Sequence, residues 1–113
     1  MGLFAMKHLL FICSSNLDRS PAAEALFKNS EKYEAKSAGV GPFAENKVNQ
    51  ELVEWADIIF VMDEDNERHK SLLLEQVPDA LDKKIIILKV PDYARNDERL
   101  ESLLRERLYN YLE

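Results

Sequence analysis

The only cysteine of the chain, Cys13, precedes Arg19 by six residues in the segment ICSSNLDRSPAAEALF, residues 12–27. A thiolate is a strong nucleophile, and a guanidinium is a planar fork that can bind two oxygens of a phosphate at once. Together they could attack a phosphoryl group in line and form a phosphocysteine. A lone cysteine after an apolar run is more often a small buried side chain. The chemistry therefore depends on the elements that position the pair.

The residues around Cys13 predict a strand, a tight loop and a helix. The apolar run KHLLFI, residues 7–12, lacks polar alternation, as expected for a strand covered on both faces. Ser20-Pro21 is typical of a helix start, with Ser20 as the cap. The amides of such a loop can converge on one point, and the first amides of the following helix are unpaired. An anion would bind there, and the same field would favour the thiolate form of Cys13.

The remaining sequence alternates between strand-like and helix-like segments. We expect strands at residues 7–12, 33–37, 57–62 and 84–90, and helices from Ser20 onwards and at 48–56, 63–76 and 97–112. This alternation predicts an α/β fold, a three-layer sandwich in which a four-stranded parallel sheet carries helices on both faces. Ligands of such sheets bind beyond the carboxyl ends of the strands, so Cys13 and Asp92 should share one rim.

Length and composition limit the partners of the protein. The 113 residues predict a single domain, 1–113, in which residues 1–5 are expected to be disordered, because Met6-Lys7 would make an equally good start. A formal net charge of −6 argues against nucleic acid and anionic membranes as partners. No apolar run reaches the ~20 residues of a membrane span. One cysteine and two histidines supply neither an internal disulfide nor a good zinc site. We expect a cytoplasmic monomer or weak dimer without metal or cofactor.

The segment after the first strand resembles the phosphate-binding loop of the low-molecular-weight protein tyrosine phosphatases, whose pattern is Cys-x-x-Asn-x-x-Arg-Ser-Pro. The residues that match this pattern are Cys13, Asn16, Arg19, Ser20 and Pro21. Three later segments, KSAGV, WADIIFVMDEDN and KVPDYARND, resemble the family in the same order, and the chain is most similar to its short bacterial branch. The resemblance implies metal-independent hydrolysis of a phosphorylated protein or small phosphomonoester through a phosphocysteine, with inorganic phosphate as product.

The resemblance also implies roles for the residues of the loop. Cys13 would be the nucleophile, Arg19 the clamp on the phosphate and transition state, and Ser20 a hydroxyl that stabilises the thiolate. Hydrogen bonds of Asn16 would shape the loop. The phosphate-binding residues would be Ser14, Ser15, Asn16, Leu17, Asp18, Arg19 and Ser20.

The chain departs from the family pattern at three places. Ser15 stands where the family often has glycine, and Asp18 stands where it often has a second cysteine, so no disulfide can form within the loop. A carboxylate at Asp18 would repel a phosphate unless it points outward. The segment between Gly39 and Trp55 is shorter than in larger members, where the substrate-recognition loop lies, so a preference for phosphotyrosine is left open.

A departing phenolate or alkoxide needs a proton, so a carboxylic acid should face the thiolate. The family takes this acid from an Asp-Pro-aromatic motif after the last strand, and the order here is Pro91-Asp92-Tyr93. The resemblance therefore implies Asp92 as the acid, although Asp92 would also suit a simple turn. Asp97 is the rival acid, and its sequence context favours the N-cap of the last helix.

Other polar clusters are interpreted as structural. Residues 63–67 resemble the start of a calcium loop, but Arg68 replaces the required glycine and Leu74 stands where the closing glutamate belongs, so helix capping is favoured. His8 and His69 have no visible partner, and Trp55 is expected to pack in the core or at the rim.

Three alternative functions are kept beside the phosphatase. A phosphate- or phosphoprotein-binding module with weakened catalysis would account for Asp18 and for the displaced acid motif. A phosphocysteine carrier would need neither Arg19 nor Asp92. An arsenate reductase of the disulfide-relay type would need further cysteines, and the chain has none.

Overall fold

The structure is a computed structural model that describes residues 5–112. The expected disorder of residues 1–5 therefore falls, apart from Ala5, outside the described residues. The elements in chain order are β1 (Lys7–Cys13), α1 (Arg19–Ala25), β2 (Tyr33–Gly39), α2 (Gln50–Trp55), β3 (Ile58–Val61), α3 (His69–Gln76), the 3₁₀ helix η1 (Pro78–Asp82), β4 (Lys84–Ile87) and α4 (Glu98–Tyr109).

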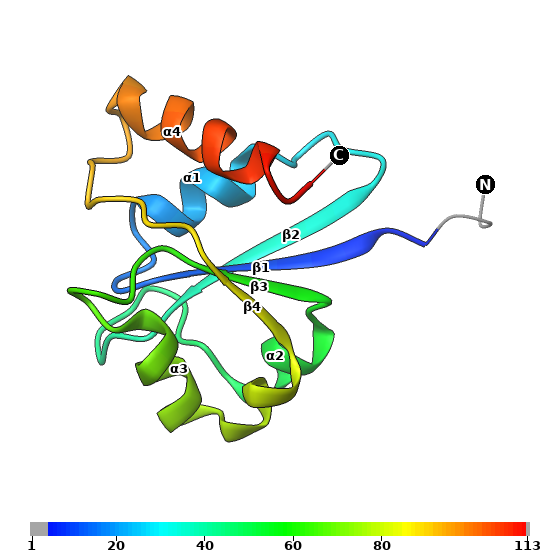
Figure 1. Ribbon diagram of the computed structural model, residues 1–113, viewed down its shortest axis with the longest axis vertical. Coiled ribbons are helices and arrows are strands. Elements are labelled where there is room, and N and C mark those ends of the chain that lie inside the picture. The colour runs from blue at the N-terminus through cyan, green and yellow to red at the C-terminus, as the bar shows by residue number, and fades with distance from the viewer. Residues whose placement is uncertain (1–4, 113) are drawn as a thin grey trace.

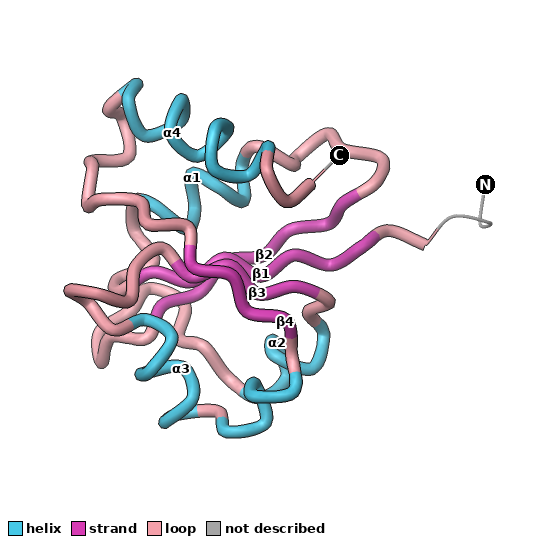
Figure 2. Tube along the Cα trace, viewed as in Figure 1, coloured by secondary structure: helices cyan, strands magenta, loops and turns pink. Residues whose placement is uncertain are grey.

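The four strands form one parallel sheet in the order β2-β1-β3-β4. Helices α1 and α4 cover one face of the sheet and α2 and α3 cover the other, as Figures 1 and 2 show. The predicted three-layer α/β fold is confirmed. None of the helices within residues 5–112 has the length and apolar character that crossing a bilayer requires.

The central strand β1 supplies both hydrophobic cores. Leu9 and Phe11 belong to the core under α1 and α4, whereas Leu10 and Ile12 belong to the core on the opposite face. All four side chains are fully buried, and burial of each is worth about 1.5–3 kcal/mol. Two-sided burial explains why this segment is continuously apolar, and it holds the end of β1 firmly.

The helix expected over residues 63–76 begins only at His69. The side chain of Asp63 accepts hydrogen bonds from the amides of Asn66 and Glu67, and Arg68 adopts a left-handed conformation with φ of 56°. A short polar side chain that binds nearby amides competes with helix formation. The prediction was therefore wrong for residues 63–68, which form a turn between β3 and α3.

The end of β4 and the start of α1 also differ from the predictions. β4 ends at Ile87 and not at Val90, because Lys89 adopts φ of 60°. The amide of Val90 still donates to the carbonyl of Met62 at 2.8 Å, so the chain stays beside β3 beyond the end of the strand. Helix α1 begins at Arg19 without a side-chain cap. The hydroxyl of Ser20, which we expected to cap the helix, lies instead beside Cys13.

Candidate active site

Strand β1 carries Cys13 to the carboxyl edge of the sheet, where its side chain is 3% exposed. The sulfur accepts a hydrogen bond from the amide of Asn16 at 3.2 Å and lies 3.0 Å from Oγ of Ser20. Both neighbours can donate to a sulfur anion. The local geometry therefore suits a thiolate at this position.

Asn16 joins the loop to strand β2. Its backbone has φ of 59°, a left-handed conformation that asparagine tolerates better than most residues. Its side-chain amide donates to Oγ of Ser20 at 2.9 Å and to Oγ of Ser37 at 3.0 Å. The side chains of Asn16 and Ser20 therefore lie beneath the loop, where they can fix its shape.

The backbone of the loop is held from outside by the segment that follows β2. The carbonyls of residues 13–15 accept hydrogen bonds from amides of residues 40, 41 and 45 at 2.9–3.0 Å. This packing requires glycine at position 39, because a Cβ there would lie 2.5 Å from the carbonyl oxygen of Ser14. With these carbonyls turned outward, the amides of Ser15, Leu17 and Asp18 donate to no other group within residues 5–112. They are available to an anion.

A pocket of about 90 Å³ lies over the loop. This volume is well below the roughly 300–1,000 Å³ of pockets for drug-sized ligands, so it suits a group as small as a phosphoryl. The structure thus brings together most of the expected site residues and adds one acidic residue that we had not assigned to the site, Glu67. The residues that line the pocket are Cys13, Ser14, Ser15, Leu17, Asp18, Arg19, Glu67 and Asp92.

Arg19 lies in the wall of this pocket with 2% of its surface exposed. Its Nη1 donates to Oε2 of Glu67 at 2.8 Å and its Nη2 to Oε1 at 2.6 Å, which is a two-point ion pair. Burial alone would lower the pKa of Arg19, but the hydrogen bonds and charge of Glu67 raise it. The hydrogen bonds from Arg19, helped by Ser14, lower the pKa of Glu67 to about 2. Both groups are charged at neutral pH.

His69 is fully buried behind the pocket, and the prediction that it has no partner was wrong. Its Nδ1 accepts from the amide of Asp63 at 3.0 Å, so its proton is on Nε2, 2.8 Å from Oγ of Ser14. That hydroxyl in turn donates to Oε1 of Glu67 at 2.7 Å. Burial lowers the pKa of His69, which keeps the ring neutral. A chain of hydrogen bonds thus connects the core to the carboxylate of Glu67.

His8 also has a partner, contrary to the prediction. Its ring stacks on Trp55 with centroids 4.3 Å apart, and its Nδ1 lies 2.9 Å from the carbonyl oxygen of Trp55. Trp55 does not line the pocket beside Cys13. His8 and Trp55 therefore pack against each other at the opposite end of the sheet.

The two candidate acids occupy different places. Asp92 lines the pocket with a side chain that is 71% exposed, and its Oδ1 lies 3.6 Å from Nε of Arg19. Asp97 caps helix α4, as predicted, by accepting a hydrogen bond from the amide of Arg99, and its contacts with Arg99 lower its pKa. Asp18 accepts from the amide of Arg95 at 2.9 Å, which ties one of its oxygens to the loop after β4.

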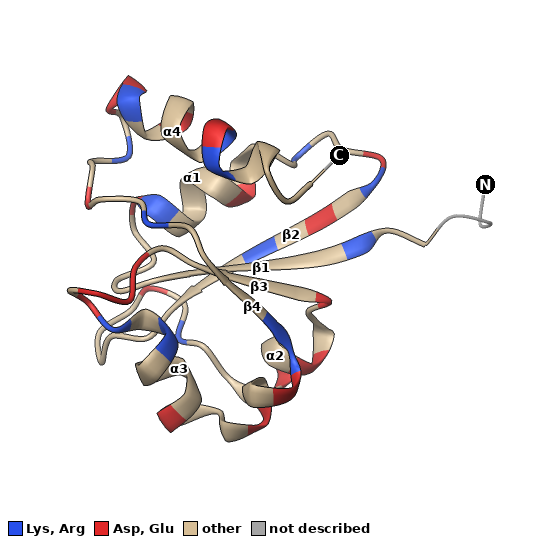
Figure 3. Ribbon diagram, in the orientation of Figure 1, with Lys and Arg blue, Asp and Glu red and all other residues tan. Residues whose placement is uncertain are grey.

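Acidic residues are concentrated beside this site. Figure 3 shows the acidic stretch in the turn between β3 and α3, close to the carboxyl edge of the sheet. The carboxylates that line the pocket are those of Asp18, Glu67 and Asp92. With one buried guanidinium between them, the rim has a net negative charge.

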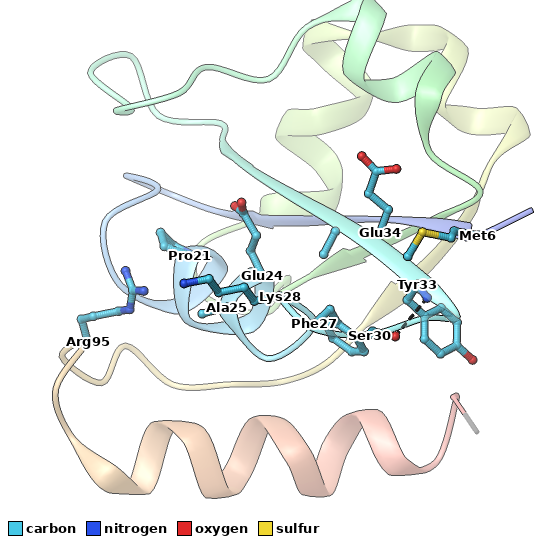
Figure 4. A pocket seen from close by; sticks show the side chains of 11 residues that line it. Met6, Pro21, Glu24, Ala25, Phe27, Lys28, Ser30, Tyr33, Glu34 and Arg95 are labelled. Atoms are coloured by element: carbon cyan, nitrogen blue, oxygen red, sulfur yellow. Dashed lines mark hydrogen bonds between the residues drawn. The ribbon is translucent and has the colours of Figure 1, made fainter.

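A larger hollow of about 490 Å³ lies elsewhere, along α1 and β2. Figure 4 shows that side chains such as Glu24, Lys28 and Tyr33 surround it, with Arg95 at one end. Neither Cys13 nor Arg19 reaches it. The thiol of Cys13 and the loop amides therefore make the smaller pocket the candidate active site.

The ion pair of Glu67 with Arg19 predicts a loss of stability in acid. The pKa of Glu67 is about 2 against an ordinary 4.5, so its contribution is present above pH 4.5 and is lost as the pH falls from 4.5 towards 2. Because 30% of the side chain is exposed, we expect a loss of about 1–2 kcal/mol after solvent screening. Urea denaturation across this pH range should show a smaller loss of unfolding free energy for Glu67→Gln than for the wild type. Equal losses in both proteins would contradict the prediction.

Known proteins resemble this chain in sequence. A profile of the family described as low molecular weight phosphotyrosine protein phosphatase matches residues 8–56. A protein-arginine-phosphatase of Geobacillus stearothermophilus is 28% identical over 99 residues, which cover 66% of this chain and 65% of the relative. The chain thus spans a little less than two thirds of the length of that curated relative.

Solved structures resemble it over most of its length. The YwlE arginine phosphatase of Geobacillus stearothermophilus is 25% identical, with a TM-score of 0.65 over 92% of this chain and 91% of that one. The low molecular weight protein tyrosine phosphatase of Streptococcus pyogenes is 21% identical and shows the same fold, with a TM-score of 0.77 over 96% and 95%. These matches confirm the resemblance seen in the loop: the chain is similar in sequence to the low-molecular-weight protein tyrosine phosphatases over residues 8–56, and it has the same fold.

Proposed function

We propose that the chain is a cytoplasmic, metal-independent phosphatase that hydrolyses phosphomonoesters through a phosphocysteine on Cys13. The observation that carries the proposal is the sulfur of Cys13 beneath amides that have no partner among residues 5–112, with the buried guanidinium of Arg19 beside it. A nucleophile and a set of donors for a tetrahedral anion converge on one small pocket. This arrangement suits phosphoryl transfer, in which positioning and charge stabilisation supply most of the catalysis.

The proposed reaction has two steps. In the first, the Cys13 thiolate attacks phosphorus, an S–P bond forms, and the P–O bond to the leaving group breaks as Asp92 donates its proton to the departing oxygen. Arg19 and the loop amides hold the equatorial oxygens. In the second, Asp92 takes a proton from water, the water oxygen attacks phosphorus, and the S–P bond breaks to release inorganic phosphate and restore the thiolate.

The substrate class is a phosphorylated protein or a small phosphomonoester. Leu17 is 55% exposed at the rim of the pocket, and it offers an apolar surface to a leaving group such as the ring of phosphotyrosine. We propose an aryl phosphate as the first candidate on this ground.

A second candidate is phosphoarginine. It is supported by the relative named protein-arginine-phosphatase and by the acidic rim of the pocket, since a departing guanidine becomes a cation when it is protonated. In this reaction the P–N bond breaks in place of the P–O bond, and Asp92 again supplies the proton.

A substrate panel assayed with a chelator tests the proposed function. We expect release of inorganic phosphate from aryl phosphates, phosphotyrosine peptides or phosphoarginine peptides, and slower release from alkyl phosphates. Arg19→Lys should lower kcat/KM about 10²–10³-fold, because a lysine is a point charge without a planar fork. Arg95→Lys, the same change at an exposed position, is the control. Phosphate binding without any turnover would favour the binding module, and full activity in Arg19→Lys would exclude Arg19 as the clamp.

A further inference from the structure

The guanidinium of Arg19 has five N–H donors, and two edges of its plane each present a pair of them. Nη1 donates to Oε2 of Glu67 at 2.8 Å and to the carbonyl oxygen of Val90 at 3.1 Å, which uses both of its hydrogens. Nη2 donates one hydrogen to Oε1 of Glu67 at 2.6 Å. The outer edge, formed by Nη1 and Nη2, is therefore fully occupied by Glu67.

The other edge of the guanidinium is not occupied by Glu67. It is formed by Nε and by the second hydrogen of Nη2. Nε is buried and has no hydrogen-bond partner within the described residues. It lies 3.6 Å from Oδ1 of Asp92, on the side of the pocket where the acid stands. A buried donor without a partner is costly, and a phosphate with two oxygens on this edge would satisfy it.

We infer that Glu67 is a positioning residue that holds the outer edge of Arg19 and thereby presents the Nε edge to the phosphate. The inference rests on the proposed function, since it assigns how the clamp of that same site is oriented. Glu67 acts through Arg19 and does not touch the reacting atoms. One carboxylate thus decides which pair of donors is left for the substrate.

The turn before α3 positions the carboxylate of Glu67. The side chain of Asp63 accepts from the amides of Asn66 and Glu67, which fixes the turn. Ser14 donates to Oε1 of Glu67, and buried His69 supports Ser14. Because each of these side chains has its own partner, Glu67 is held before a substrate arrives.

Glu67→Gln is the central test. The glutamine places an NH₂ group against one Nη atom, so the two-point contact cannot form. We expect kcat to fall about 10–100-fold, as for a clamp displaced by a fraction of an ångström to an ångström. The inhibition constant of inorganic phosphate should stay the same or decrease, because a negative charge beside the anion is removed. Glu75→Gln, the same change in an exposed ion pair with Arg68, is the control.

Two further measurements separate positioning from stability. In an Arg19→Lys background the Glu67→Gln change should cost less than about 3-fold, because a lysine has no fork to orient. The ¹H–¹⁵N resonance of Arg19 Nε should shift when inorganic phosphate is added to the wild type, and this response should be lost or changed in Glu67→Gln. A merely structural role would not produce this pattern.

The outcomes distinguish the inference from the proposed function. A rise in kcat/KM in Glu67→Gln would identify Glu67 as an inhibitory plug and overturn the inference, as would an equal loss in the Arg19→Lys background. If the wild type hydrolyses no substrate, the proposed function fails, and the Nε resonance then decides alone. An unchanged phosphate response in Glu67→Gln would overturn the positioning role in that case.

Discussion

Replacement of Cys13 by serine is expected to lower the release of phosphate more than about 10⁴-fold, as removal of a catalytic nucleophile does in other enzymes. The sulfur contacts the amide of Asn16 and the hydroxyl of Ser20, and neither is a base. The nearest imidazole, that of His69, bonds Ser14 instead. A serine at this position would therefore keep its proton and remain a poor nucleophile.

The same variant should still bind phosphate, because the amides of the loop and Arg19 are unchanged. Inorganic phosphate should raise the Tm of Cys13→Ser about as much as that of the wild type. In the wild type, phosphate should protect Cys13 from alkylation, and rapid quenching during turnover should reveal the mass of one added phosphoryl group. Turnover by Cys13→Ser at a rate near the wild type would refute the phosphocysteine mechanism.

Replacement of Asp92 by asparagine should have the second-largest effect, and its size should depend on the leaving group. A leaving group of low pKa departs without a proton, whereas an alkoxide or tyrosyl phenolate needs one in the transition state. We expect little change for activated aryl esters and a loss of about 10²–10⁴-fold for alkyl and tyrosyl esters. A series of aryl phosphates that differ in leaving-group pKa would measure this as a steeper dependence of kcat/KM.

Asp97→Asn is the matched control for this experiment. Asp97 caps α4 and pairs with Arg99, so its replacement should weaken the start of that helix and leave the leaving-group dependence unaltered. If the dependence steepens in Asp97→Asn and not in Asp92→Asn, the acid has been assigned to the wrong carboxylate. If neither changes it, a water molecule serves as the acid or the protein is not a competent phosphatase.

Much of the candidate site could be predicted because its parts are close together in the sequence. Cys13 is the last residue of β1 and Arg19 is the first residue of α1, so one short loop joins them, and the short-range pattern of that segment determines its shape. Asp92 could be placed at the same rim because parallel strands end on one side of a sheet. These predictions needed only the order of the elements.

Glu67 could not be found in the same way. It lies 48 residues from Arg19 in the sequence, and the segment that holds it has the composition of a charged helix. The left-handed backbone at Arg68 is not readable from an arginine, which rarely adopts it. One signal was present: a buried guanidinium needs a carboxylate partner, and Asp63 followed by polar residues suits a capped turn. That signal indicates a partner for Arg19 without identifying which acid it is.

The central place of β1 in the sheet has a consequence for how the site fluctuates. Leu9 to Ile12 pair with strands on both sides and are shielded on both faces. Their amides can exchange with solvent only when the whole domain unfolds, whereas Asp92 lies in an exposed loop beyond an edge strand, which can open alone. Cys13, the proposed nucleophile, and Asp92, the proposed acid, therefore belong to regions of different local stability. Brief openings of the loop after β4 would move Asp92 away from the pocket, while Cys13 and the loop amides around it stay in place.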